Sequence, residues 1–208
     1  MALPYPDDTT PPLRGVYYPT ETDRASANWT KFFAFAGVAD YPSFAAKAAA
    51  EPDWFWTKLI AFLDIRFETP FTQVRDMSPG IEHARWCVGG RMNMTVSLLD
   101  RQVAAGRGAH EAILWESEDG RTRRLTYAGL LQQTEELAAG LAAKGIGEGD
   151  VIGLFMPMIP ETAVAFLAIA RLGAIVLPLF SGFGENALVT RLNDAGAVAV
   201  ITAEETVR

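Results

Sequence analysis

The most constraining feature of this sequence is a regular alternation of short apolar runs with longer helix-like segments in its second half. Residues 151–156, 175–180 and 197–202 are apolar runs of strand length, and the first of them is too apolar for a strand with one face exposed to solvent. The segments between them, 161–172 and 185–195, have the length and composition of helices. Strands spaced in this way need right-handed crossover connections, which make the strands parallel. The sequence therefore predicts an α/β fold with a mostly parallel sheet and helices on both faces.

A hairpin and a long helix are expected immediately before this sheet. Residues 111–116 and 123–126 have strand character and flank Asp119-Gly120, a pair that takes up the backbone of a tight turn easily. Thr126 is a suitable N-cap for a helix that continues to Lys144, and Gly145 is a suitable stop.

The first half of the chain has a different composition. Residues 1–25 contain several prolines, so we expect an extended arm there without regular helix or strand. Residues 26–108 are rich in aromatic side chains and carry helix signals at 44–50, 54–63 and 95–105. We therefore expect three parts: the arm (1–25), a helical, aromatic-rich N-terminal extension (26–108), and the first part of an α/β domain (109–208).

Charge and hydropathy exclude several classes of protein. The net charge is -7 and the pI about 4.9, whereas a general nucleic-acid binder needs a basic face. Residues 162–183 are mostly apolar over a length close to the ~20 residues that cross a bilayer. Arg171, Gly173 and Pro178 interrupt this stretch, so we expect a buried helix and strand and no membrane span. No export signal opens the chain and Cys87 is the only cysteine, so a cytoplasmic protein is expected.

Most motifs that carry chemistry are absent from the sequence. Residues 145–149 contain three glycines, but they follow a helix and precede a strand, which is the reverse of a dinucleotide-binding loop and argues against a nicotinamide oxidoreductase. His83 and His110 have no neighbours at metal-ligand spacing, and Cys87 has no activating neighbour. We therefore predict no metal site and no catalytic residue.

The best candidate for ligand contact is the glycine-containing stretch at residues 180–184. It follows an apolar strand and precedes a helix, and ligands of parallel sheets bind beyond the carboxyl ends of strands. The same pattern also suits a tight strand-to-helix turn without any ligand. Arg208 follows the next strand on the same side of the predicted sheet, where it could hold a phosphate or end the strand in solvent.

Several dispersed motifs together resemble the acetyl-CoA synthetases and related acyl-CoA synthetases, which are adenylate-forming, AMP-binding ligases. In the second half the similarity is carried by residues 156–161, 170–174, 180–183, 191–194 and 201–204. Upstream, the amino-terminal extension of that family is matched by Trp86, Gly89-Gly90, Asn93 and residues 99–101.

The resemblance implies a two-step ligase. A carboxylate and ATP would form an acyl-adenylate and pyrophosphate, and the thiol of CoA would then attack this adenylate, with Mg²⁺ assisting phosphoryl transfer. By the resemblance, Gly182 lies near the adenine of CoA with Phe180 and Ser181 beside it, and Arg208 pairs with a CoA phosphate. The partners implied are a small carboxylic acid, ATP and CoA.

The sequence departs from the family pattern in two respects. Cys87, Ser97, Gln102 and Ser181 replace the family's usual residues, which leaves the acid substrate open. The family's phosphate loop, acyl pocket and carboxy-terminal domain would all follow Arg208, so we expect a truncated amino-terminal fragment without adenylation activity of its own. An incomplete sheet would also favour a homo-oligomer. The alternative is a stand-alone, non-catalytic binding or dimerisation module derived from this family.

Overall fold

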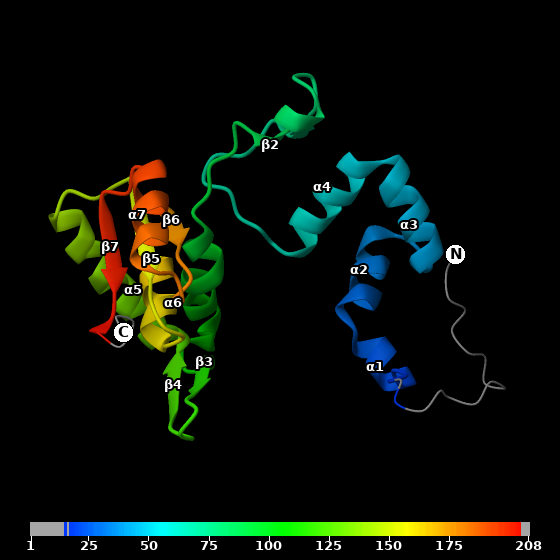
Figure 1. Cartoon of the computed structure of the whole chain (residues 1–208). Helices are drawn as coiled ribbons and strands as arrows, with labels where there is room; N and C mark the ends of the chain where they lie inside the picture. Colours follow the sequence, from blue (N-terminus) through cyan, green and yellow to red (C-terminus); the bar gives the residue numbers. More distant parts are fainter. Residues whose placement is uncertain (1–14, 16, 205–208) are drawn as a thin grey trace. The chain divides into compact units, whose positions relative to one another are not determined.

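The computed structural model describes residues 15 and 17–204, which form two compact units (Figure 1). The first unit comprises the described residues up to Ile65 together with Gln73–Val88. The second comprises Arg66–Thr72 and the described residues from Gly89 onward. Arg208 lies outside the described residues.

The first unit is a cluster of helices built around phenylalanine side chains. Its helices are α1 (Glu21–Ser26), α2 (Asn28–Ala36), α3 (Tyr41–Ala50) and α4 (Pro52–Phe62). Phe32 and Phe44 are buried and meet edge to face with their ring centroids 5.8 Å apart, an arrangement that aromatic rings favour. Asp40 begins α3 by accepting a hydrogen bond from the Ser43 N–H, and proline stands in the first turn of both α3 and α4.

Two features of the first unit differ from the sequence expectations. Helix α1 lies within the stretch expected to be an extended arm, because Thr20 and Asp23 form a capping box that begins a helix despite the nearby prolines. A short antiparallel hairpin, β1 (Gln73–Asp76) and β2 (Arg85–Val88), lies in a segment for which no strand was predicted from the sequence. A single 3₁₀ turn, η1 (Ile81–His83), stands between these strands.

The first helical segment of the second unit is an irregular helix over the predicted segment 95–105. It contains two π-helical stretches, η2 (Val96–Asp100) and η3 (Val103–Arg107), and it ends where Gly106 takes a φ of 77°. The expected hairpin follows as β3 (Glu111–Glu116) and β4 (Thr122–Thr126), paired antiparallel. Thr126 then caps α5 (Tyr127–Ala143) by accepting a hydrogen bond from the N–H of Gly129.

A parallel three-stranded sheet forms the centre of the second unit. Its strands are β5 (Val151–Phe155), β6 (Ile175–Pro178) and β7 (Ala199–Thr202), in the order β6-β5-β7. Helix α6 (Pro160–Arg171) connects β5 to β6, and α7 (Glu185–Asp194) connects β6 to β7.

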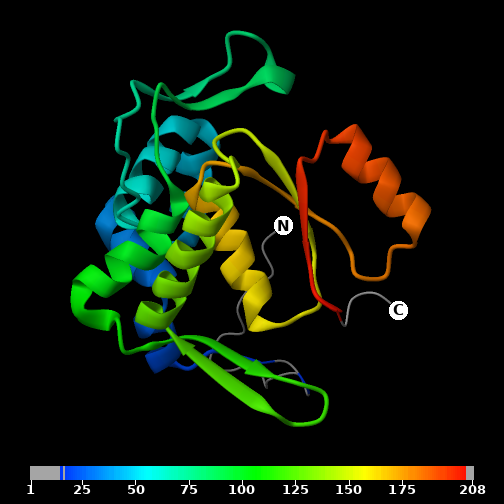
Figure 2. The ribbon, with the colours of Figure 1, turned by 90° about the vertical axis from the view of Figure 1, so that its left-hand side faces the viewer.

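Helices cover both faces of this sheet (Figure 2). On one face, Ile152 of β5 is fully buried in a cluster with Leu141 of α5 and Ile169 of α6. On the other face, a methyl group added at Gly153 would lie 2.7 Å from the Leu192 side chain of α7, so this helix packs directly on the strand. The predicted fold class is therefore confirmed.

The stretch that raised the possibility of a membrane span is divided between α6 and β6. Helix α6 has 12 residues, and among the described residues no helix is long and apolar enough to cross a membrane.

Candidate functional site

The predicted contact residues lie in the connection between β6 and α7, which we call the rim loop (residues 179–184). Leu179 is buried, and its N–H donates to the carbonyl oxygen of Leu154, which ties the start of the loop to β5. The N–H of Phe183 donates to the carbonyl oxygen of Phe180 at 2.9 Å and closes a tight turn. The loop therefore stands at the carboxyl end of the sheet, as the sequence indicates.

The structure brings Phe180, Ser181 and Gly182 together at the surface of this turn. Phe180 is 68% exposed, and its ring meets Phe183 edge to face with the centroids 5.7 Å apart. A methyl group at Gly182 would lie 2.5 Å from the Phe180 ring, so glycine is needed for the ring to adopt this position. In this conformation the space above Gly182 is therefore occupied by the chain's own aromatic ring.

A polar cavity of about 690 Å³ lies at the same end of the sheet, beyond the carboxyl ends of β5 and β7. Since β6 and β7 flank β5 on opposite sides, this position is the topological switch point, where open α/β sheets usually bind ligands. Its lining comes from the β3–β4 hairpin, the start of α6 and the residues after β7, and includes Trp115, Arg121, Arg123, Glu161 and Glu204.

Arg123, one of the two arginines that line this cavity, is already paired with a carboxylate. Arg123 makes two hydrogen bonds to the carboxylate of Glu161, at 3.1 and 2.5 Å, and lies 5.9 Å from the ring of Trp115. The hydrogen bonds from Arg123 lower the pKa of Glu161 below its usual value. A ligand in this cavity would have to compete with that ion pair. Sequence reasoning missed the cavity, because the order of the strands, which creates it, was not predicted.

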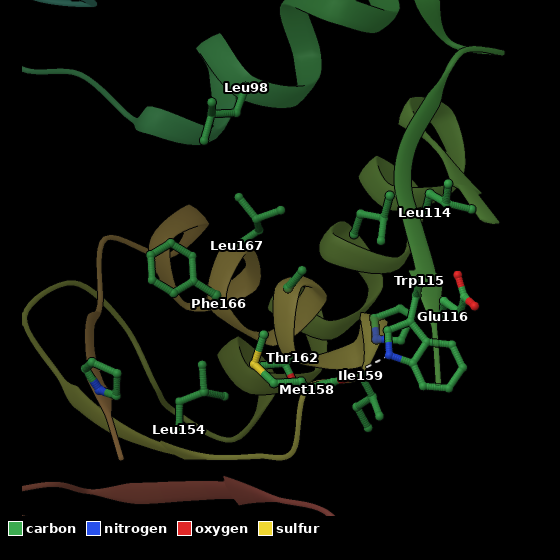
Figure 3. Close-up of a pocket in the computed structure, with 14 residues that line it drawn as sticks. Leu98, Leu114, Trp115, Glu116, Leu154, Met158, Ile159, Thr162, Phe166 and Leu167 are labelled. Carbon is green, nitrogen blue, oxygen red and sulfur yellow. Dashed lines mark hydrogen bonds between the residues drawn. The ribbon is translucent and has the colours of Figure 1, made fainter. Parts of the chain in front are cut away.

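A second cavity, of about 880 Å³, is almost wholly apolar (Figure 3). Leu98, Leu114, Phe166, Leu167 and Met158 lie around it, and the indole N–H of Trp115 donates to the Met158 carbonyl oxygen at 2.6 Å. This cavity has no side chain suited to bind a charged group other than Glu116 at its edge.

An ion-pair network fixes the irregular helix to α5 and α6. Arg171, at the end of α6, makes two hydrogen bonds to Asp100, at 2.9 and 3.0 Å, and one to Glu135, at 2.7 Å. These bonds lower the pKa of Asp100 and raise that of Arg171. The side-chain amide of Asn93 donates to the carbonyl oxygens of Ala170 and Arg171 at the end of the same helix. The motif residues Asn93 and Asp100 are therefore structural.

In the described part of the chain, no group of three His, Cys, Asp or Glu side chains is placed to hold a metal ion. The 208-residue sequence contains no lysine-bearing glycine-rich loop for the phosphates of ATP.

Comparisons with known proteins agree with the motifs. A family model of AMP-binding enzymes matches residues 99–208, and a model of the acetyl-coenzyme A synthetase N-terminus matches residues 41–98. The acetyl-coenzyme A synthetase of Rhodopirellula baltica is 42% identical over 185 residues, which are 86% of this chain and 27% of that protein. The enzyme of the same name from Deinococcus radiodurans is 39% identical over 166 residues, 80% of this chain and 25% of that protein.

A solved structure supports the same relationship. Acetoacetyl-CoA synthetase from Streptomyces lividans matches with a TM-score of 0.80 and 28% identity, covering 88% of this chain and 29% of the other. The chain spans about a quarter of the length of the curated relatives it matches. The resemblance seen in the sequence is confirmed: the chain belongs to the family of AMP-binding enzymes, and its matched relatives in that family are acetyl- and acetoacetyl-CoA synthetases.

Proposed function

We propose that this chain is the amino-terminal part of an acyl-CoA synthetase, which converts a small carboxylic acid, ATP and CoA into acyl-CoA, AMP and pyrophosphate. One observation supports this proposal above the others. The two family models match residues 41–98 and 99–208 without a gap, and the similar curated sequences are named ligases of the same family. In this proposal the aromatic-rich extension comprises residues 26–108 and the first part of the adenylate-forming domain residues 109–208, whereas the two family models meet ten residues earlier, between residues 98 and 99. The proposal includes a cytoplasmic location.

The contribution proposed for these 208 residues is part of the CoA-binding rim. In this proposal the adenine lies near Gly182, with Phe180 and Ser181 beside it. The ring of Phe180, which stands over Gly182 and is exposed, offers the adenine a flat apolar surface. Arg208 would pair with a CoA phosphate, which is the interaction that guanidinium groups make best.

The chemistry at the acyl group is proposed to depend on residues beyond this chain. ATP and Mg²⁺ belong to the proposed reaction of the whole protein, and the sequence contains no lysine-bearing glycine-rich loop for the phosphates of ATP. The 208-residue chain alone is therefore expected to form no acyl-adenylate. Carboxylate-dependent exchange of pyrophosphate into ATP by the purified chain would contradict this expectation.

Direct titration of the purified chain with CoA tests the rim. We expect Phe180→Ala to weaken CoA binding by about five-fold or more, the effect of removing a ring on which a base stacks. Leu114→Ala is the matched control, because Leu114 is a similarly exposed apolar side chain on β3 (61% against 68% for Phe180). Arg208→Ala should weaken binding of CoA and leave binding of adenosine unchanged. Equal affinities of the Phe180 and Leu114 variants would overturn the rim assignment.

The second candidate function is a non-catalytic binding or dimerisation module. Among the described residues no further strand pairs with β6 or β7, and these unpaired sheet edges favour such a module. If the wild-type chain dimerises and has no affinity for CoA, the module is the better description.

A further inference from the structure

Arg191 of α7 lies over one of the two aromatic rings of the rim loop, that of Phe183. Its guanidinium carbon lies 4.2 Å from the centroid of the Phe183 ring, well within the range of a cation–π contact. One of its nitrogens donates to the carbonyl oxygen of Ala187, one turn earlier in the helix, at 3.0 Å. The guanidinium group is thus held both by its own helix and by the ring.

The contact with Phe183 continues to Phe180. The two rings meet at an interplanar angle of 78°, and the Phe180 ring also rests on the backbone of Gly182. Most of Phe180 faces solvent, since 68% of the residue is exposed. Its orientation therefore depends on Phe183 on one side and Gly182 on another.

We propose that Arg191 is a positioning residue for the purine ring of the ligand: by holding Phe183, it fixes the ring of Phe180 on which the purine stacks. This inference rests on the proposed function, which places the adenine of CoA at Phe180. Without Arg191, the exposed Phe180 ring would populate several rotamers, and stacking would carry the entropic cost of selecting one.

A direct ionic contact is the competing explanation, because CoA is an anion and Arg191 is a cation. The two explanations differ in their dependence on ligand charge. A positioning residue affects a neutral nucleoside as much as a charged nucleotide, whereas an ionic contact affects only the charged ligand and is screened by salt. Adenosine and adenosine 3′,5′-bisphosphate are therefore the two probes.

The experiment follows the amide NMR signals of residues 181–184 while each probe is added to the 208-residue chain. We expect Arg191→Gln to weaken the binding of adenosine and of the bisphosphate by the same factor. This factor should be about two- to five-fold, which corresponds to the loss of a surface cation–π contact. Arg191→Lys should lose less affinity for both probes, since the positive charge is kept and only the stacking of the planar guanidinium group is lost. Phe183→Leu should also weaken the binding of both probes. Combining it with Arg191→Gln should weaken binding little further, because the two side chains act through the same contact. Arg124→Gln is the control: it removes a positive charge from the β3–β4 hairpin and should leave the affinity for adenosine unchanged.

A second readout separates this inference from the proposed function. In the absence of any ligand, Arg191→Gln should shift and broaden the ring signals of Phe180 and Phe183, while signals from α5 and α6 stay in place. The positioning role is overturned if the ring signals of Phe180 and Phe183 do not change in Arg191→Gln. It is also overturned if only the affinity for the bisphosphate falls and this loss disappears at high salt. A wild-type chain that binds neither probe overturns the assignment of the ligand, and the ring signals then still decide whether Arg191 orders Phe180.

Discussion

At the scale of single residues, one charged side chain in an apolar stretch joins three helical segments of the second unit. Arg171 interrupts the longest apolar segment of the sequence, where it argues against a membrane span. In the structure its side chain is only 23% exposed and joins Asp100 of η2 and Glu135 of α5 to the end of α6. The position of an arginine among apolar residues was visible in the sequence, but its two carboxylate partners are 71 and 36 residues away and carry no local signal.

The Asp100–Arg171 pair predicts a pH-dependent contribution to the stability of the second unit. We expect Asp100→Asn to lower the free energy of unfolding by about 1–2 kcal/mol at neutral pH, because a charge-assisted pair that is partly exposed is lost. The pKa of Asp100 is depressed in the folded state, so its contribution is present above the unfolded-state value of ~3.9 and disappears as the pH falls through the folded value. The difference between wild type and variant should therefore shrink on acidification below pH ~4.

Urea unfolding followed by the indole N–H signal of Trp115 measures this difference in the second unit. Glu118→Gln, which removes an exposed carboxylate from the hairpin turn, is the control and should change stability by less than ~0.5 kcal/mol. A wild-type advantage over Asp100→Asn that stays constant from pH ~7 to pH ~3 would show that the pair is not the source.

At the scale of elements, the sequence predicts best where a local signal begins or ends a segment. Thr126, Pro160 and Gly184 each stand at the start of a helix, and Gly145 and Gly173 take positive φ values just past helix ends. The β1–β2 hairpin was missed because its four-residue strands include charged residues and show no apolar alternation. The π-helical turns were missed for a different reason: they depend on tertiary packing, which helix propensity does not contain.

In the candidate site, too, the features with a local sequence signal were predicted and those that depend on tertiary structure were missed. The rim loop was found because a glycine-containing turn after an apolar strand is a local pattern. The contact of Arg191 with Phe183 joins a loop to the middle of a helix, and the cavity at the switch point depends on strand order. Neither the Arg191–Phe183 contact nor the cavity is indicated by a local sequence pattern.

The packing of α7 on the sheet can be tested at two glycines. Gly153→Ala should destabilise the second unit by about 1–3 kcal/mol, because the new methyl group would lie 2.7 Å from Leu192 and 3.3 Å from Leu179 and Val200. Gly140→Ala is the matched control on α5, where an added methyl group meets no atom within 4 Å. This control should stabilise the helix by about 0.5–1 kcal/mol, since alanine has the higher helix propensity. Thermal unfolding of both variants measures the difference, and equal midpoints would contradict the close packing of α7 on β5.

At the scale of the whole molecule, the described sheet has two open edges. Strands β6 and β7 each pair with β5, and in the described residues no further strand joins them. Unpaired backbone groups on an edge strand are a template for another strand, and apolar side chains there favour the association. Ile175 of β6 is 52% exposed and Val198, which leads into β7, is 59% exposed.

We therefore predict that the 208-residue chain self-associates through one of these edges, with a weight-average mass that rises with concentration in light scattering. A lysine on an edge opposes such pairing, because its charge would have to leave water. Val198→Lys and Ile175→Lys test the two edges separately, and Ile81→Lys, at an 80% exposed position in the first unit, is the control. Loss of association in one of the first two variants identifies the edge that pairs. A chain that stays monomeric at high concentration, or one whose association survives both substitutions, contradicts pairing at the sheet edges.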